Sequence, residues 1–276
     1  MAKRAEKPDP AREITALWPS AGPEHSLALL KALHILTRNG ALNQDSRRKL
    51  KQVLHLVQLL RPPIEELLKE KDEPVLADLG AGKSYLGFIL YDLIFGPAGR
   101  GSVTGIESRE DLADMSRALA KESGFMRMDF LCAPIAEASL PAGRADIVTA
   151  LHACDTATDD AILFGLRHDA KVIALVPCCQ AEVARALEDK KGALDQLWRH
   201  PIQRREFGAH ITNVMRGLFL ESHGYKVRAT ELVGWEHSLK NELILAERHQ
   251  RSNAMAKAAL DRLVDQLGVR PVLLNS

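Results

Sequence analysis

The stretch Val75-Leu-Ala-Asp-Leu-Gly-Ala-Gly-Lys-Ser-Tyr85 decides the fold of this chain. Its first five residues form a short, mostly apolar run, which is typical of a buried β-strand. Gly80 and Gly82 follow almost at once, and the apolar residues from Tyr85 onwards suit a helix. A glycine turn between a strand and a helix brings the backbone close to a ligand in α/β folds. The stretch therefore predicts an α/β domain with a ligand loop at its first strand end.

Short apolar runs alternate with helical segments beyond this stretch. The expected strands after Val75–Leu79 are Ser102–Ile106, Met126–Leu131, Ile147–Leu151, Val172–Val176, Lys226–Leu232 and Asn241–Ala246. Such alternation implies a parallel sheet covered on both faces, and the short link Gly234–Lys240 suits an antiparallel hairpin. The order resembles the Rossmann-like class I methyltransferase fold. We therefore expect a seven-stranded, mostly parallel sheet that ends in an antiparallel hairpin.

Helical patterns flank and interrupt the predicted sheet. Residues 1–11 read as a charged tail, 12–70 as a helical extension, 71–248 as the main domain with a helical insertion at 181–223, and 249–276 as a helical tail. Within the extension we expect helices over Ser26–Asn39 and Ser46–Leu60, an interruption at Arg61-Pro62-Pro63, and a short helical stretch, Ile64–Glu70. The insertion lies where a lid over the substrate would lie, and a structural role fits it equally well.

The composition is that of an ordinary globular protein. Of the 276 residues, 46% are hydrophobic and 26% charged, and the formal net charge is +1, so any contact with nucleic acid has to come from local patches. No apolar run approaches the ~20 residues that span a membrane, and the charged N-terminus lacks the apolar core of a signal peptide. The cysteines, Cys132, Cys154, Cys178 and Cys179, lack zinc-site spacing. We expect no membrane span, no bound metal and a cytoplasmic location.

Acidic residues beside the glycine loop suggest which ligand it binds. Gly80 and Gly82 permit close approach of the backbone, and Asp78 can hold a cationic amino group directly or through water. Glu107, at the end of the second strand, can accept hydrogen bonds from both hydroxyls of a ribose. An amino-acid-bearing nucleoside such as S-adenosylmethionine fits this pair. The residues expected to contact it are Asp78, Gly80, Ala81, Gly82, Tyr85, Glu107, Ser108, Ile135 and His152.

Two other glycine motifs compete with this interpretation. A phosphate-binding P-loop requires a glycine where Ala77 stands, and the charge of Asp78 would repel phosphates. A dinucleotide fingerprint requires glycine or alanine where Tyr85 stands. A bare tight turn is the remaining alternative. No acid follows the third strand to hold an adenine, so backbone groups and Ile135 are expected to serve there.

Three unusual segments follow later strands, where parallel sheets gather their reacting groups. They are His152-Ala-Cys-Asp-Thr-Ala-Thr-Asp159, Val176-Pro-Cys-Cys-Gln180 and Glu236-His-Ser-Leu-Lys-Asn241. Together they resemble one methyltransferase-domain family over about residues 45–250. That family contains uncharacterised bacterial proteins and the methyltransferase half of a eukaryotic glutathione-S-transferase C-terminal-domain-containing protein. More distant relatives are tRNA ribose 2′-O-methyltransferases and enzymes that modify ribosomal protein. The resemblance implies S-adenosylmethionine as cofactor and suggests RNA as substrate.

The chain departs from the tRNA enzymes at two of these segments. Those enzymes have glycine at the position of Asp155, and histidines at the positions of Gln180 and Ala181. The departures leave the substrate open. A protein or small-molecule methyltransferase is one alternative to an RNA methyltransferase, and a module that binds S-adenosylmethionine without catalysis is another.

Methyl transfer needs an aligned acceptor and a group that helps to remove its proton. The candidates are Asp155 as proton acceptor or orienting carboxylate, His152 as base and Lys240 as a cation beside the acceptor. Cys178 is a candidate thiolate nucleophile of the kind that activates pyrimidine rings. Each has a structural alternative: a helix cap among Asp155, Thr156 and Thr158, a buried histidine, or small core cysteines. A metal site formed by His152, Cys154 and Cys178 or Cys179 lacks local ligand spacing.

Two basic clusters are candidates for phosphate contact. The first is Arg47, Arg48, Lys49 and Lys51, and the second is Arg199, His200, Arg204, Arg205 and His210. A solvated helix face explains such clusters equally well. Aromatic residues make up only 5% of the chain, which offers no platform for stacking bases. The residues expected to contact the substrate are Cys154, Thr156, Pro177, Cys179, Arg204, Arg205, His237 and Asn241.

Overall fold

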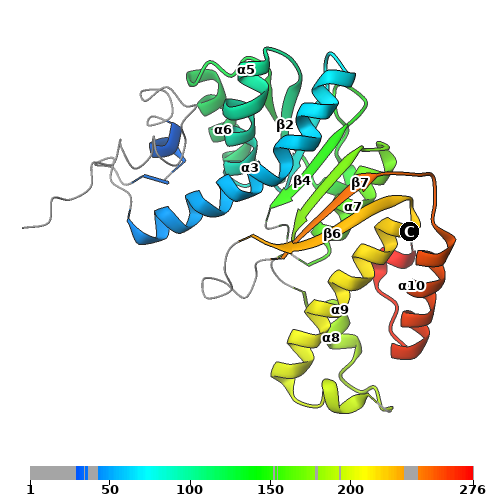
Figure 1. Ribbon diagram of the computed structural model, residues 1–276. Coiled ribbons are helices and arrows are strands. Elements are labelled where there is room, and N and C mark those ends of the chain that lie inside the picture. Colours follow the sequence, from blue (N-terminus) through cyan, green and yellow to red (C-terminus); the bar gives the residue numbers. More distant parts are fainter. Residues whose placement is uncertain are drawn as a thin grey trace, which may run out of the picture.

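The computed structural model describes residues 29–275 except 34, 37–42, 152, 154, 178–179, 193 and 233–241, and omits the side chains of residues 45, 46 and 49. Its sheet has the order β3-β2-β1-β4-β5-β7-β6 (Figure 1). The strands are β1 Val75–Leu79, β2 Ser102–Glu107, β3 Met128–Cys132, β4 Ile147–Leu151, β5 Val172–Val176, β6 Tyr225–Glu231 and β7 Glu242–Arg248. The first five pair in parallel, and β7 pairs antiparallel with β5 and β6. The predicted seven-stranded sheet with its terminal hairpin is confirmed.

Helices cover both faces of this sheet (Figure 1). They are α3 Gln44–Glu70, α4 Tyr85–Leu90, α5 Gly96–Ala98, α6 Glu110–Glu122, α7 Ala157–Arg167, α8 Glu182–Ala186, α9 Pro201–Ser222 and α10 Ala254–Leu267. A π-helical turn, Tyr91–Phe95, and 3-10 turns at Ile135–Glu137, Asp195–Leu197 and Val272–Asn275 complete the set. Side chains alternate along each strand, so Leu76 joins the core under α3 and α4, while Ala77 and Leu79 join the core under α7 and α9. None of the helices among the described residues is long and apolar enough to cross a membrane.

The helical extension differs from the sequence prediction in two places. Helix α3 continues through Pro62 and Pro63, so the predicted interruption is wrong. Leu60 and Ile64, on either side of the proline pair, are both fully buried, and this packing outweighs the two missing backbone donors. The helix predicted over Ser26–Asn39 is also too long, since among its described residues 29–32 are helical, 33 is a turn and 35–36 form a bend.

The strand boundaries depart by a few residues at β3 and in the hairpin. Met126 is 86% exposed in the turn that follows α6, and its N–H bonds to the carbonyl of Gly124, so β3 begins two residues later than predicted. Strand β6 begins at Tyr225, whose buried ring and hydroxyl anchor it to the carbonyl of Ala170 at 2.7 Å. These shifts leave the topology unchanged.

Most of the predicted insertion is a structural helix. Along α9, Met215, Phe219 and Leu220 are buried against the sheet, and the helix also contacts α8 and α10. The C-terminal tail forms α10, whose first turn is capped by the side chain of Asn253. The second half of α9 therefore completes the core, while its first turns, from Pro201, project beyond it.

Candidate functional site

The site is expected where the strand order reverses, between β1 and β4. Parallel strands on the two sides of such a point send their loops in opposite directions and leave a crevice at their carboxyl ends. Here the crevice is bordered by the glycine loop after β1 and the loop after β4. Glu107, the last residue of β2, and Pro177, directly after β5, extend the same edge.

The glycine loop is held in a conformation that requires glycine. Gly80 and Gly82 have φ angles of +60° and +56°, in the left-handed region that other residues rarely adopt. The N–H of Ala81 bonds to the carbonyl of Ile106 at 2.9 Å, which fixes the loop against β2. A side chain at Gly82 would meet nothing within 4 Å, so its backbone faces open space. The loop therefore presents exposed backbone to a ligand.

Asp78 lies beneath this loop and shapes it. Its carboxylate accepts hydrogen bonds from Ser84 Oγ at 2.7 Å and Thr149 Oγ1 at 2.8 Å, and the residue is only 1% exposed. Burial raises the pKa of Asp78 to about 6, although these hydroxyls partly oppose the rise. The geometry leaves Asp78 no exposed oxygen for direct contact with an amino group. The carboxylate instead joins β1, β4 and the start of α4.

Glu107 closes the loop from the β2 side. Its Oε2 accepts from the N–H of Gly82 at 2.7 Å, and its Oε1 accepts from the N–H and Nε of Arg109 at 3.0 and 3.3 Å. Burial opposes the charge, but these donors and the positive charge of Arg109 outweigh it, so the pKa of Glu107 lies below its ordinary value. Glu107 is thus an ionised acceptor beside an open loop, and it suits a pair of ribose hydroxyls.

The other predicted cofactor residues surround these two groups. Ile135 is 9% exposed, and its Cδ1 lies 3.8 Å from where a side chain on Gly80 would begin. Ser108 is exposed and donates to Glu107 at 3.4 Å, and Tyr85 packs against the core under α3. Arg109 was not predicted. An arginine two residues after a strand-end acid was the available signal.

On the β4 side, Asp155 has a left-handed backbone, with a φ of +52°. Glycine adopts such a conformation without strain, and aspartate adopts it more often than most other residues. The carboxylate of Asp155 accepts from the N–H of Ala181 at 3.2 Å and lies 3.7 Å from Arg185, and its side chain is 37% exposed. Asp155 therefore ties the β4 loop to the start of α8 and keeps part of its carboxylate accessible.

The two neighbouring threonines lie in different surroundings. Thr156 is the N-cap residue of α7, but its side chain makes no capping hydrogen bond. Thr158 is buried within the helix and donates to the carbonyl of Ala153 at 2.6 Å. Thr158 is therefore not the helix cap, because its hydroxyl closes the turn before α7. Thr156 is exposed at the loop surface.

An arginine that the sequence did not single out lies behind this loop. Arg216 of α9 is fully buried and pairs with Asp159 of α7 at 2.6 Å. It also donates to the backbone carbonyl of Asp155 at 2.9 Å and faces the side-chain oxygen of Gln180. A charged residue within an otherwise apolar helix face, between Ile211 and Phe219, was the signal for it.

Several predicted residues lie outside the described part of the chain. These are His152, Cys154, Cys178, Cys179, His237, Lys240 and Asn241, together with the side chain of Lys49. Pro177, directly after β5, is buried. Among the described residues no group of three or more histidines, cysteines or acids is arranged to hold a metal ion.

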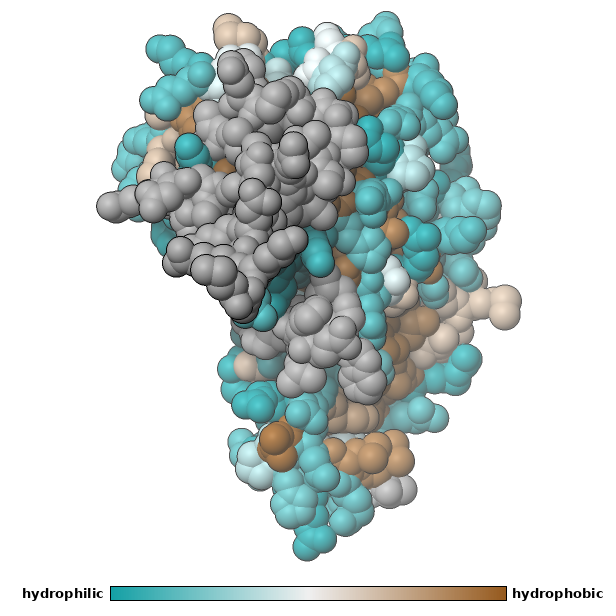
Figure 2. All heavy atoms as spheres, turned by 60° about the vertical axis from the view of Figure 1, so that its left-hand side comes forward, coloured by the Kyte–Doolittle hydropathy of each residue, from teal (hydrophilic) through white to brown (hydrophobic). Residues whose placement is uncertain are grey.

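The two basic clusters differ in the exposure and ion pairing of their charged side chains. Arg48 and Lys51 are exposed at the start of α3. Arg204 is only 17% exposed and pairs with Glu188 at 2.5 Å, whereas Arg205 is exposed. Exposed apolar side chains accompany the second cluster, namely Leu194 at 46%, Leu197 at 48% and Ile202 at 58%. Figure 2 shows a mostly hydrophilic face on which hydrophobic residues gather in the lower half.

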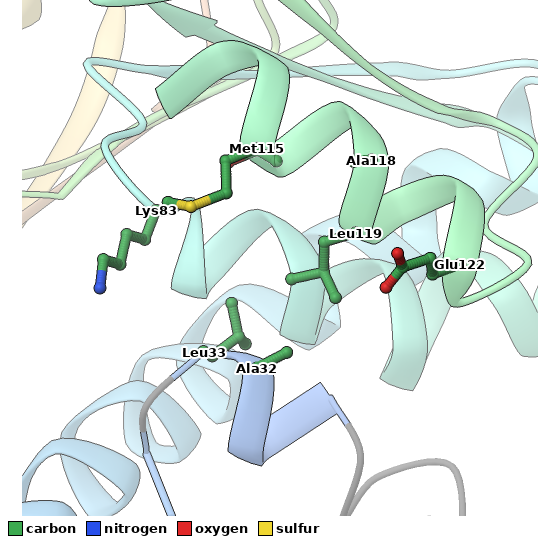
Figure 3. Close-up of a pocket in the computed structure, with 8 residues that line it drawn as sticks. Ala32, Leu33, Lys83, Met115, Ala118, Leu119 and Glu122 are labelled. Carbon is green, nitrogen blue, oxygen red and sulfur yellow. The ribbon is translucent and has the colours of Figure 1, made fainter. Parts of the chain in front are cut away.

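A separate pocket of about 230 Å³ lies behind the glycine loop. It is lined by residues 32–33, by Lys83 and by α6 side chains that include Met115, Leu119 and Glu122 (Figure 3). Lys83 and Met115 lie together at one end, and Glu122 lies at the other. The pocket shares none of the predicted cofactor residues. It therefore lies apart from the crevice at the strand ends.

Solved methyltransferases share this fold. A cofactor-bound protein of MTB, Rv0187, is 20% identical over 90% of this chain and 100% of its own, with a TM-score of 0.50. A SAM-dependent methyltransferase from Aquifex aeolicus is 19% identical over 66% of this chain and 86% of its own, with a TM-score of 0.40. Magnesium protoporphyrin IX methyltransferase from Synechocystis PCC 6803, with bound SAM, is 13% identical over 89% and 100%, with a TM-score of 0.45. No curated protein matches the chain.

The sheet order, the glycine loop and the strand-end acid are those expected of an S-adenosylmethionine-dependent methyltransferase. Residues 48–186, just over half of the chain, match the methyltransferase domain family, and the chain belongs to that family. S-adenosylmethionine, the methyl donor that the glycine loop and the strand-end acid suit, is its cofactor. The ionised Glu107 and the open backbone at Gly82 fit the ribose and amino-acid portions of this molecule.

Proposed function

We propose that this methyltransferase modifies RNA, tRNA or rRNA, and that it belongs to the branch of the family with the His152–Asp159, Val176–Gln180 and Glu236–Asn241 motifs. The observation that carries the proposal is the position of the α3 cluster. Helix α3 bonds through His55 to the carbonyl of Leu232, directly after β6, at the same sheet edge as the glycine loop. Arg48 and Lys51 lie one to two turns further out, so they flank the crevice.

The second cluster supports the same substrate. Strands β5 and β6 run in the same direction, since both are antiparallel to β7. Helix α9 leads from the carboxyl end of β5 back to the amino end of β6, so its first turns lie at the carboxyl edge of the sheet. Exposed Arg205 and Arg199 are therefore on the side of the sheet where the methyl donor binds. Cations on both sides of a crevice suit a phosphate backbone drawn across it.

Residues of this chain divide the work of methyl transfer. S-adenosylmethionine supplies a methyl group on a sulfonium that is already reactive. Glu107 and Ser108 hold its ribose, the glycine loop faces its amino-acid portion, and Ile135 lines the adenine side. Asp78 and Tyr85 support the loop from behind. Asp155 accepts or orients the proton of the acceptor hydroxyl, with His152 and Lys240 as further candidates for this step.

The strand-end loops would hold the acceptor itself. We assign substrate contact to Thr156, Arg205 and the neighbouring segments that carry Cys154, Pro177, Cys179, Arg204, His237 and Asn241. Cys178 as a covalent nucleophile is the alternative for a pyrimidine acceptor. We expect the enzyme to act in the cytoplasm, where its RNA substrates and reduced thiols are found.

Transfer of labelled methyl groups to fractionated RNA, protein and metabolite pools tests the proposal directly. We expect label in the RNA pool. Binding of the RNA that accepts label should weaken steeply with salt, because phosphate contacts release counterions. Replacing Arg48 and Lys51 together by alanine should reduce the salt slope by about one unit for each phosphate that is no longer neutralised.

The matched control is the double variant Lys69→Ala/Lys121→Ala, which removes two exposed cations at the opposite edge of the sheet. It should leave RNA binding unchanged. Label in protein or metabolites but not in RNA would replace the proposal with the second candidate, which the exposed Leu194, Leu197 and Ile202 favour as a contact for an apolar surface. Absence of label in every pool would favour a non-catalytic binding module.

A further inference from the structure

Arg216 connects three segments that are far apart in the sequence. Its Nε bonds to Asp159 Oδ1 at 2.6 Å, and its Nη2 bonds to the carbonyl oxygen of Asp155 at 2.9 Å. The same guanidinium faces the side-chain oxygen of Gln180. Asp155 and Asp159 belong to the segment after β4, and Gln180 follows β5. One buried side chain of α9 therefore holds both loops that border the acceptor side of the crevice.

The connection extends to the hairpin. Asn213, one turn before Arg216, accepts from its Nη1 at 3.4 Å and donates to Glu242 Oε2 at 2.7 Å. Glu242 begins β7, directly after the Glu236–Asn241 motif. The Arg216 network, defined here as Arg216, Asp155, Asp159, Gln180 and Asn213, thus reaches each of the three motif segments or its immediate neighbour.

Packing alone does not account for an arginine at this place. Arg216 is fully buried and Asp159 is 4% exposed, and removing such a pair from water costs free energy that its attraction only partly returns. An apolar residue would fill the same face of α9 beside Met215 and Phe219. What an arginine adds is a rigid, planar set of five donors that fixes several acceptors relative to one another.

One of those acceptors is under backbone strain. Asp155 has a φ of +52°, a left-handed conformation that a non-glycine residue keeps only when its surroundings hold it. Arg216 binds the carbonyl of this residue, while the N–H of Ala181 binds its carboxylate. The strained turn is thereby fixed from behind, and its carboxylate stays partly exposed beside the start of α8.

We propose that Arg216 is a positioning residue for methyl transfer. It fixes the loops after β4 and β5 in the arrangement that aligns the acceptor, and it touches neither the cofactor nor the acceptor. This role rests on the proposed place of the acceptor at the ends of β4 and β5.

The test compares Arg216→Lys with Arg167→Lys, a matched change at an arginine near the exposed end of α7. Three quantities are measured on the full chain: the affinity for S-adenosylmethionine by calorimetry, amide hydrogen exchange in residues 155–160 and 180–186, and methyl transfer to the pool that the wild type labels. For Arg216→Lys we expect cofactor affinity within twofold of the wild type and faster exchange in both segments. The turnover rate should fall by about 10- to 100-fold, because small misplacements of the acceptor slow transfer strongly.

Turnover of Arg216→Lys within twofold of the wild type would overturn the proposal, and so would a parallel loss of cofactor binding, which indicates general damage. If this variant does not fold, Asp159→Asn, which keeps a neutral acceptor for Arg216, takes its place with a smaller expected loss. The two proposals can fail separately. The pool that the wild type labels tests the RNA proposal, whereas the turnover rate of the variant relative to the wild type on that pool tests the role of Arg216. If no pool accepts label, exchange in the two segments as slow as in the wild type overturns the proposal.

Discussion

The two halves of the crevice are built in different ways. At the ends of β1 and β2 the loop is fixed by backbone N–H groups, by two left-handed glycines and by acids within 30 residues of one another. At the ends of β4 and β5 the loops are held by side chains from distant elements, as in the Arg216–Asp159 pair, which is separated by 57 positions. The half at β1 and β2, assigned to the methyl donor and called the donor half below, is therefore a local structure of the strand–helix unit. The half at β4 and β5, assigned to the methyl acceptor and called the acceptor half, depends on the completed fold. A family can keep the donor half while its substrates change.

The first prediction tests the donor half of the crevice through Glu107. Glu107→Ala should weaken S-adenosylmethionine binding by roughly 100-fold or more, since it removes a charged acceptor for hydroxyls and releases the N–H of Gly82. Calorimetry measures the effect, and Glu110→Ala, an exposed acid on the first turn of α6, is the control. An affinity within threefold of the wild type would contradict the assignment of the donor half.

Asp155 is the corresponding test of the acceptor half. Asp155→Asn keeps an acceptor for Ala181 and tolerates the left-handed backbone, but it cannot take up a proton. We expect turnover to fall by about 100-fold, as for loss of a general base, with cofactor affinity unchanged. Methyl transfer to the labelled pool gives the rate. Asp155→Gly, which also suits the backbone, should be no more active, and full activity of either variant would reduce Asp155 to a structural role.

A third prediction concerns Asp78, which underlies both halves. Its folded pKa of about 6 exceeds its ordinary value of 3.8, so the folded protein binds the proton more tightly than the unfolded chain. The resulting stabilisation is complete below about pH 4 and is lost as the pH rises through 6, a change of about 2 to 3 kcal/mol. Asp78→Asn should abolish this component. Denaturant unfolding between pH 4 and 7.5 measures it, and equal pH dependence in both proteins would show that Asp78 is not the group involved.

The smallest effect is expected from the loop backbone. An alanine side chain at position 82 would meet no atom within 4 Å, so the free-energy cost of Gly82→Ala comes from the left-handed conformation alone. This cost is about 1 kcal/mol, which corresponds to a roughly fivefold loss of cofactor affinity if the loop shifts to relieve it. Thermal unfolding and calorimetry detect it. Gly192→Ala, which also meets nothing within 4 Å but lacks the left-handed φ, should change neither quantity.

The donor half could be predicted from the sequence because its signals are local. Val75–Leu79, the glycines and Glu107 lie within one strand–helix–strand unit, and their spacing alone indicates their meeting. The buried position of Asp78 could not be predicted, since it depends on Thr149 of a strand that follows 71 residues later. Arg216 was missed for the same reason, because its partners become neighbours only when α9 packs on the sheet.

Local propensity also failed where tertiary packing opposed it. The pair Pro62 and Pro63 predicts the end of a helix, but the buried Leu60 and Ile64 carry α3 through it. The predicted start of β3 at Met126 was wrong because this apolar side chain was taken to be buried, whereas it is exposed.

The left-handed turn at Asp155 has a further consequence for how this position can evolve. A single nucleotide exchange converts a glycine codon into an aspartate codon, and this backbone accepts either residue, whereas a branched side chain would force the loop apart. The chain can thus gain or lose a carboxylate facing the crevice in one mutational step, with the loop already in place. New acceptor chemistry is accessible at this position without any redesign of the scaffold.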